Sequence, residues 1–130
     1  MGLGASIKGM DPPPKFVRVA RQESNKSPAN YKLGCVIFKG NRVLGRGFNI
    51  NKTHPKFGSG WASCIHAEGG ALMNAISRTS LQTVKGSYAV VYRRNNNLAK
   101  PCKDCRNLLK EYGVKRIYYS NGTGYAKISN

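Results

Sequence analysis

The chain has 130 residues, a length that suits one domain with a single hydrophobic core and excludes two. Its 22 Lys and Arg residues outnumber five Asp and Glu residues, which gives a formal net charge of +17. The sequence has no apolar run long enough to span a membrane and no apolar core of a secretory signal, so we expect an intracellular, cytoplasmic protein.

The first third of the chain predicts a tail, a helix and a hairpin. Residues 1–11 are rich in glycine and predict a flexible tail, followed by a single domain at residues 12–130. Prolines and then apolar residues at helical spacing predict a first helix that ends at about Ser24. Two strand-like runs joined by a glycine-containing turn, at residues 32–40 and 41–49, predict a β-hairpin.

A long polar loop at residues 50–63 separates this hairpin from a second helix. Loops of this length inside a compact domain are often functional. The helix is predicted from His66 to about Ser77, and its core-facing positions are expected to be Leu72, Met73 and Ile76. Gly69 and Gly70 weaken a helix by about 1 kcal/mol each relative to Ala. We expect them to give room for close packing against the third helix or the sheet.

The last part of the chain predicts three strands and a third helix. The strand-like runs are residues 87–93, 115–120 and 124–129. The helix precedes the second of these strands, ends at Gly113, and has an apolar face formed by Cys105, Leu108, Leu109 and Tyr112. Only the four residues NGTG separate Ser120 from Tyr125 in the last two strands. A parallel crossover needs about a dozen residues, so these strands are predicted to be antiparallel in a mixed sheet flanked by helices.

Four cysteines in an intracellular chain indicate metal binding or catalysis before disulfides. Cys35 lies in an apolar strand-like run and is predicted to be a core residue. Cys64 either packs in the core or supports the site. Cys102 and Cys105 form a CxxC pair directly after Pro101, and this pair carries the strongest signal.

Zinc is the metal that this pattern predicts. His66, Cys102 and Cys105 are residue types that bind zinc, and three protein ligands leave a fourth position for water, as in a catalytic site. Both ligand groups would lie at helix N-termini, where the helix dipole favours thiolates. Glu68 is close enough in sequence to reach zinc-bound water and move its proton. A structural zinc site is the alternative, and its candidate fourth ligands are His54, Cys35 and Cys64.

Two motifs, His66-Ala67-Glu68 and PCKDC at Pro101–Cys105, resemble those of the zinc-dependent cytidine/deoxycytidylate deaminase superfamily. The resemblance covers residues 12–128 and implies an α/β fold with three α-β-α layers around a mixed five-stranded sheet. It implies one Zn²⁺ per chain, with His66, Cys102 and Cys105 as its ligands. It also implies hydrolysis at C4 of a cytosine with release of ammonia, with Glu68 as the proton shuttle.

The resemblance further implies substrate contacts and assembly. Asn49 ends the second strand in a pattern similar to the family's G-x-N and would contact the sugar or the base. The backbone of Ala67 would face the base edge, and His54 would lie in the loop that shapes the pocket entrance. Small deaminase domains of this superfamily often complete their sites with neighbouring subunits, so we expect a homo-oligomer.

The substrate prediction has several alternatives. Free-nucleoside cytidine deaminases usually carry Cys-Ala-Glu, whereas His-Ala-Glu is used by deoxycytidylate and tRNA-adenosine deaminases, which commonly place a helix between the last two strands. Small chains of this kind are also similar to virus-encoded deaminases. The leading prediction is a deaminase of a cytosine nucleoside or nucleotide, such as cytidine or dCMP.

A deaminase of single-stranded DNA or RNA is the first alternative, favoured by the charge and by Phe57 and Trp61 in the long loop. Adenosine or guanine substrates, and a non-catalytic zinc module that binds nucleic acid, are the others.

Overall fold

The elements follow the predicted order along the chain, with two short helical segments added. The computed structural model describes residues 12–29, 31–50 and 66–130. The helical elements are α2 (Pro14–Lys26), α4 (Ala67–Arg78), α5 (Leu81–Val84), the 3-10 helix η3 (Arg94–Asn96) and α6 (Lys103–Glu111). The strands are β1 (Leu33–Lys39), β2 (Arg42–Phe48), β3 (Tyr88–Arg93), β4 (Arg116–Ser120) and β5 (Tyr125–Ser129).

The five strands form one mixed sheet in the order β2-β1-β3-β4-β5. β1 is antiparallel to both β2 and β3, as the predicted hairpin requires for the first pair. β3 and β4 are parallel, and α6 makes the crossover between them. β4 and β5 are antiparallel, which confirms the prediction made from the short NGTG connection.

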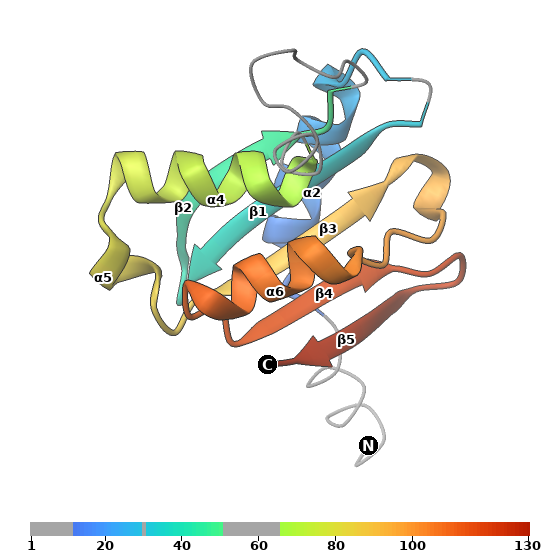
Figure 1. Cartoon of the computed structure of the whole chain (residues 1–130). Coiled ribbons are helices and arrows are strands. Elements are labelled where there is room, and N and C mark those ends of the chain that lie inside the picture. The colour runs from blue at the N-terminus through green and yellow to red at the C-terminus, as the bar shows by residue number, and fades with distance from the viewer. Residues whose placement is uncertain (1–11, 30, 51–65) are drawn as a thin grey trace.

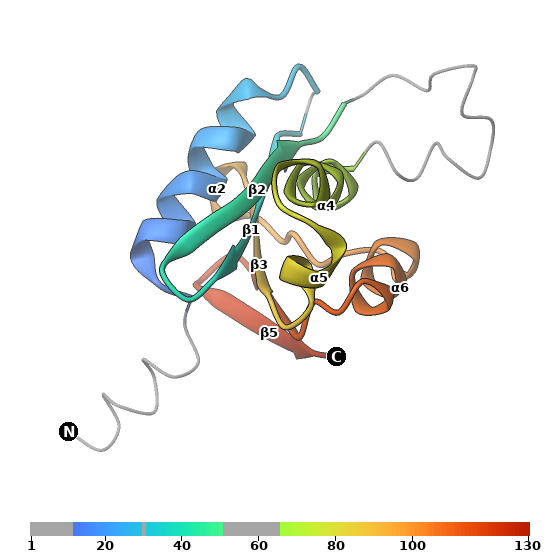
Figure 2. The same cartoon turned by 90° about the vertical axis from the view of Figure 1, so that its left-hand side faces the viewer.

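Helices cover both faces of the sheet, so the predicted three-layer α-β-α architecture is confirmed. Figures 1 and 2 show α2 on one face and α4, α5 and α6 on the other. Neighbouring residues of β1 point to opposite faces: Val36 packs in the cluster under α2, and Ile37 in the cluster under α4 and α6. Covering both faces explains why β1 and β3 are nearly continuous apolar runs.

The helix α2 lies very close to β1 because Gly34 has no side chain there. A Cβ atom at Gly34 would lie 2.1 Å from the backbone oxygen of Ala20. Phe16 of the same helix stacks on Phe38 of β1, with ring centroids 4.0 Å apart. The helix ends at Lys26, two residues beyond the predicted Ser24.

Strand glycines also allow the close approach of α4 to the sheet. A Cβ atom at Gly45 of β2 would lie 2.3 Å from the backbone nitrogen of Ala75, and one at Gly47 would lie 2.5 Å from that of Ala71. A Cβ at Gly70 would meet its nearest neighbour at 3.9 Å, an ordinary contact. The expectation that Gly70 makes room for this packing is therefore wrong, because the strand glycines provide the room at these contacts. The same expectation for Gly69 stays a prediction.

The prediction that Met73 faces the core is also wrong. Its side chain is 53% exposed, whereas Leu72 is fully buried. Successive helical residues point about 100° apart, and the buried stripe of α4 is formed by Ala71, Leu72 and Ala75. Ile76 packs at the edge of the core.

The short helix α5 was absent from the predicted elements. Ser80 caps it by accepting a hydrogen bond from the backbone N–H of Thr83 at 3.0 Å, and Val84 is fully buried in the core. Four residues are too few to show helical periodicity. Its cap serine is the one local signal.

Several predictions lie outside the described residues. They are the flexible tail at residues 1–11, the functional loop, and the roles of His54, Phe57, Trp61 and Cys64. Within the described ranges, none of the helices combines the length and apolar character required to cross a membrane.

Candidate metal centre and active site

The predicted zinc ligands come together where two helices begin. His66 is the N-cap residue of α4, and Cys102 is the N-cap residue of α6. Cys105 lies in the first turn of α6. The two helices pack side by side on one face of the sheet with their N-termini at the same end (Figure 1), just beyond the carboxyl end of β3. Ligand sites of α/β sheets commonly lie at this end of the strands.

The geometry of the three side chains fits one zinc ion. The Nδ1 atom of His66 lies 3.1 Å from Sγ of Cys105 and 3.6 Å from Sγ of Cys102. The three ligand atoms all lie within 4.8 Å of one another. Tetrahedral zinc, with Zn–N of about 2.0 Å and Zn–S of about 2.3 Å, places N and S about 3.6 Å apart. Two thiolates also suit helix N-termini, because the positive end of the helix dipole favours negative charge.

Cys35 is not part of this group. It is fully buried in β1, and burial, followed by the negative charge of Glu68, raises the pKa of its thiol well above the ordinary value. The prediction of a core cysteine is confirmed, and the alternative that Cys35 supplies a fourth ligand is wrong. Within residues 12–29, 31–50 and 66–130, the metal-binding group consists of three residues, whereas the other candidate fourth ligands, His54 and Cys64, lie outside these ranges.

Glu68, two residues after His66, is buried although it is a carboxylate. It is the second residue of α4, and its exposed fraction is 4%. Burial raises its pKa to about 7, and a hydrogen bond from its own backbone amide opposes this shift. The described residues place no Lys or Arg within ion-pair distance of it.

Asn49, a predicted substrate contact, is tied into the fold. Its Oδ1 atom accepts hydrogen bonds from Ser27 Oγ at 2.6 Å and from the backbone N–H of Leu33 at 2.9 Å. Its Nδ2 atom donates to the carbonyl oxygen of Tyr31 at 2.9 Å. These bonds hold Asn49 at the end of β2, and its contact with a substrate stays a prediction. No sequence signal pointed to Ser27 as its anchor.

Ala67 is fully buried at the start of α4. Its backbone oxygen lies beside β2, where a Cβ atom added to Gly47 would meet it at 3.0 Å. The structure thus places Ala67 between the metal group and the end of β2, next to the strand that leads to Asn49.

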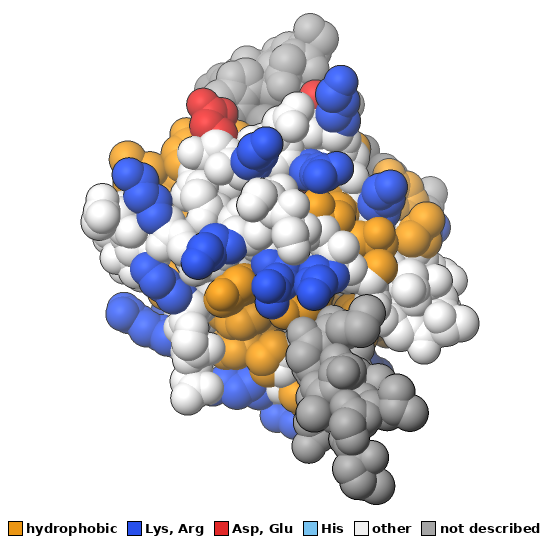
Figure 3. Space-filling view, turned by 90° about the horizontal axis from the view of Figure 1, so that it is seen from below, with side chains coloured by type: hydrophobic (Ala, Val, Ile, Leu, Met, Phe, Trp, Pro, Cys, Tyr) orange, Lys and Arg blue, Asp and Glu red, His pale blue; other side chains and the backbone are white. Residues whose placement is uncertain are grey.

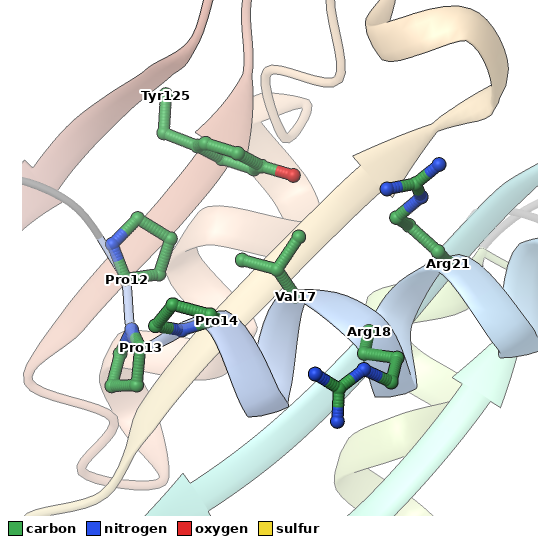
Figure 4. A pocket seen from close by; sticks show the side chains of 7 residues that line it. All are labelled: Pro12, Pro13, Pro14, Val17, Arg18, Arg21 and Tyr125. Carbon is green, nitrogen blue, oxygen red and sulfur yellow. The ribbon is translucent and has the colours of Figure 1, made fainter.

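A separate hollow of about 700 Å³ lies on the opposite face of the sheet. Tyr125 of β5 reaches toward the prolines and Val17 at the start of α2, and Arg18 and Arg21 lie farther along the helix (Figure 4). None of the predicted site residues lines it. The hollow is therefore distinct from the metal group.

The sequence matches the family of the cytidine and deoxycytidylate deaminase zinc-binding region over residues 10–121. The chain belongs to this family. The match includes both motifs that form the metal group, so the superfamily prediction and its zinc cofactor are confirmed. No curated protein matches the sequence.

Solved structures share the fold at low sequence identity. The dCMP deaminase of cyanophage S-TIM5 is 24% identical, with a TM-score of 0.63, over 84% of this chain and 82% of that one. The cytidine deaminase of Burkholderia pseudomallei is 18% identical, with a TM-score of 0.67, over 88% and 90%. The cytidine deaminase of Mycobacterium leprae is 18% identical, with a TM-score of 0.62, over 87% and 90%. The dCMP deaminase and the two cytidine deaminases thus share this architecture.

Proposed function

We propose that the protein is a zinc-dependent hydrolytic deaminase that converts a cytosine nucleoside or nucleotide to its uracil form. The observation that carries the proposal is the metal group of His66, Cys102 and Cys105 with the buried carboxylate of Glu68 two residues after the histidine. A structural zinc site would have no use for that carboxylate. Membership of the deaminase family supports the same conclusion.

In this proposal each residue has one task. His66, Cys102 and Cys105 would hold the zinc ion at the neighbouring N-termini of α4 and α6. Zinc, when bound, lowers the pKa of a coordinated water to about 7 and so supplies a nucleophile at neutral pH. Glu68 would accept one proton of the attacking water and deliver it to N3 of the cytosine. The water oxygen would bond to C4 and the C4–N4 bond would break. The second proton of the water would pass to the amino group, which leaves as ammonia.

The proposed substrate contacts surround this centre. The backbone of Ala67 would face the base edge, Asn49 would contact the sugar or base, and His54 would line the entrance. A nucleotide is a reasonable substrate because a structure of the cyanophage dCMP deaminase, which has the same fold, is a complex with dCMP and dUMP. We further propose that a homo-oligomer completes the site.

Deamination of a substrate panel tests the proposal. Zinc-loaded protein would be incubated with cytidine, deoxycytidine, CMP, dCMP and adenosine, and the products identified by mass spectrometry, with Glu68→Gln as the matched variant. We expect a cytosine compound to gain about one mass unit by exchange of NH for O, and the variant to keep zinc but lose turnover. Zinc-loaded protein that turns over no cytosine compound would contradict it.

A deaminase of single-stranded nucleic acid is the second candidate. The observation that favours it is the charge of +17, because a single nucleotide needs only a few positive groups whereas a polymer attracts many. Adding cytosine-containing DNA and RNA oligomers to the panel separates the two candidates.

A further inference from the structure

A basic groove of about 510 Å³ lies between α6 and the end of β5. Four cationic residues line it, together with Pro101, Asn107 and the last two residues of the chain, and none of the lining residues is acidic. These four residues, the groove cations, are Lys100, Lys103, Arg106 and Lys110, and all are exposed. The face shown in Figure 3 has the same bias, with many Lys and Arg side chains and few acidic ones.

The cations of α6 form one stripe along the helix. Lys103, Arg106 and Lys110 are spaced at i, i+3 and i+7 and therefore share one side. With a rise of about 1.5 Å per residue, the stripe is about 10 Å long. Cys105 and Leu109, which are buried, lie on the side that faces the core. The stripe thus points away from the core into the groove.

The like charges of the stripe repel one another in the isolated protein. Arg106 and Lys110 are cations at i, i+4, and Lys103 lies at the positive end of the helix dipole. The dipole itself is served by Asp104 in the first turn and by Lys110 in the last turn. The ion pairs within the described part of the chain both involve Glu23, so none neutralises the groove cations. An anionic ligand in the groove would relieve this repulsion.

We propose that this groove binds the phosphodiester backbone of single-stranded nucleic acid. Four cations distributed along a groove suit successive phosphates better than one small anion, and the overall charge of +17 attracts a polyanion from a distance. The volume of about 510 Å³ lies in the range of small-molecule clefts. A single strand is the form that we propose, because deaminase chemistry needs an unpaired base.

The position of the groove connects it to the metal group. Lys100 and Pro101 line the groove and directly precede Cys102. A strand in the groove therefore passes close to the metal group, and deaminase chemistry needs an unpaired base. This last step rests on the deaminase chemistry of the proposed function and favours its second candidate, in which the substrate is a polymer. The binding itself does not depend on catalysis.

Fluorescence anisotropy with a labelled, single-stranded oligothymidylate of 20 nucleotides tests the binding. The oligomer contains no cytosine, so failure of deamination and failure of binding are observed separately. Four phosphate contacts predict a slope of about −2.8 in log affinity against log salt, which is a fall of about 50-fold between 50 and 200 mM salt.

The test variant replaces the groove cations by glutamine, and we expect it to lose most of the affinity and salt dependence. A matched control replaces four exposed cations on other elements by glutamine: Arg18, Arg42, Arg78 and Lys85. We expect this control to bind nearly as tightly as the unchanged protein. Two double variants, Lys100→Gln with Arg106→Gln and Lys103→Gln with Lys110→Gln, should each lose about half of the slope and serve if the fourfold variant fails to fold.

Several results would overturn the proposal. Equal losses in the test and control variants would show a general charge effect and no groove. Equal affinity for a duplex of the same length would remove the single-strand assignment. Full competition by inorganic triphosphate at equal phosphate concentration would indicate a small-anion site, and binding of phosphatidylserine vesicles without binding of the oligomer would indicate a membrane surface.

Discussion

Glu23 and Glu68 are two buried carboxylates on opposite faces of the same sheet. Their exposed fractions are 3% and 4%, so burial does not distinguish them. Glu23 of α2 has Lys26 Nζ at 2.7 Å and Arg46 Nη1 at 3.9 Å from its Oε2 atom. Glu68 of α4 has no such cation among the described residues, and it follows the metal-group histidine.

The difference shows that the neighbours of a buried carboxylate decide its role. Cations at Glu23 compensate its loss of hydration, so this carboxylate belongs to the packing of α2 against the sheet. Glu68 receives no such compensation and costs stability where it lies. A buried carboxylate that keeps this cost two residues after a metal-group histidine is suited to handle protons in a reaction.

Substitution of Glu68 should give the largest functional effect. We expect Glu68→Gln to lower kcat by about 10²–10⁴-fold, because the amide cannot carry the proton. Zinc content and the free energy of unfolding should not fall, since the change removes a buried carboxylate that lacks a cation. Deaminase kinetics, metal analysis and urea unfolding measure these quantities. If the variant lost zinc together with activity, Glu68 would have a structural role like that of Glu23, and the comparison would be wrong.

Alanine substitutions at strand glycines should show a second difference between the two faces of the sheet, in zinc content. We expect Gly45→Ala to destabilise the protein by about 3 kcal/mol, because the added methyl group overlaps the backbone of α4. It should also lower zinc content, since α4 carries His66. Gly34→Ala overlaps α2 in the same way and should destabilise the protein while zinc binding of the folded fraction stays unchanged. Zinc loss in both variants would mean that the faces are coupled.

Removal of the Glu23 carboxylate should affect stability alone. We expect Glu23→Gln to reduce the free energy of unfolding by about 1 kcal/mol, because one short and one longer ion pair are lost from partly exposed cations. The value of kcat should stay within about twofold, as expected of a residue outside the site. Urea unfolding and kinetics of the same preparation give both numbers. A fall in kcat as large as that of Glu68→Gln would contradict the comparison.

The smallest expected effect is a gain in stability. Gly70 lies in the first turns of α4, where an added methyl group meets no atom closer than 3.9 Å. Gly70→Ala should therefore raise the free energy of unfolding by up to about 1 kcal/mol through helix propensity. Urea unfolding measures the gain, and Gly45→Ala is the opposite control. Destabilisation by Gly70→Ala would show that the helix glycine has a packing role after all.

Much of the fold was predictable because the signals are local. Helical spacing at Phe16 and Ala20, a glycine-containing turn in the hairpin, and the four residues between the last strands each depend on neighbouring residues only. The two motifs were recognisable for the same reason, since His66 with Glu68, and Cys102 with Cys105, are close in sequence. These signals sufficed for the family and its metal group.

Predictions that depended on distant neighbours were less successful. Met73 follows the helical pattern loosely, and only the position of the sheet shows that it points outward. Gly70 looked like the source of close packing, but the clearance is set by Gly45 and Gly47 on β2. From the sequence alone, Cys35 was a candidate metal ligand, but its position in β1 lies outside the metal group.

The sequence alone determined the class of chemistry, zinc-dependent deamination, because the types and spacings of the metal ligands can be read within short segments of the chain. Tertiary structure alone decided how those segments meet: which carboxylate has cations beside it, which cysteine is in the core, and where the groove cations face the end of β5. Distances and burial depend on residues from separate elements. They are therefore fixed only when the helices pack on the sheet.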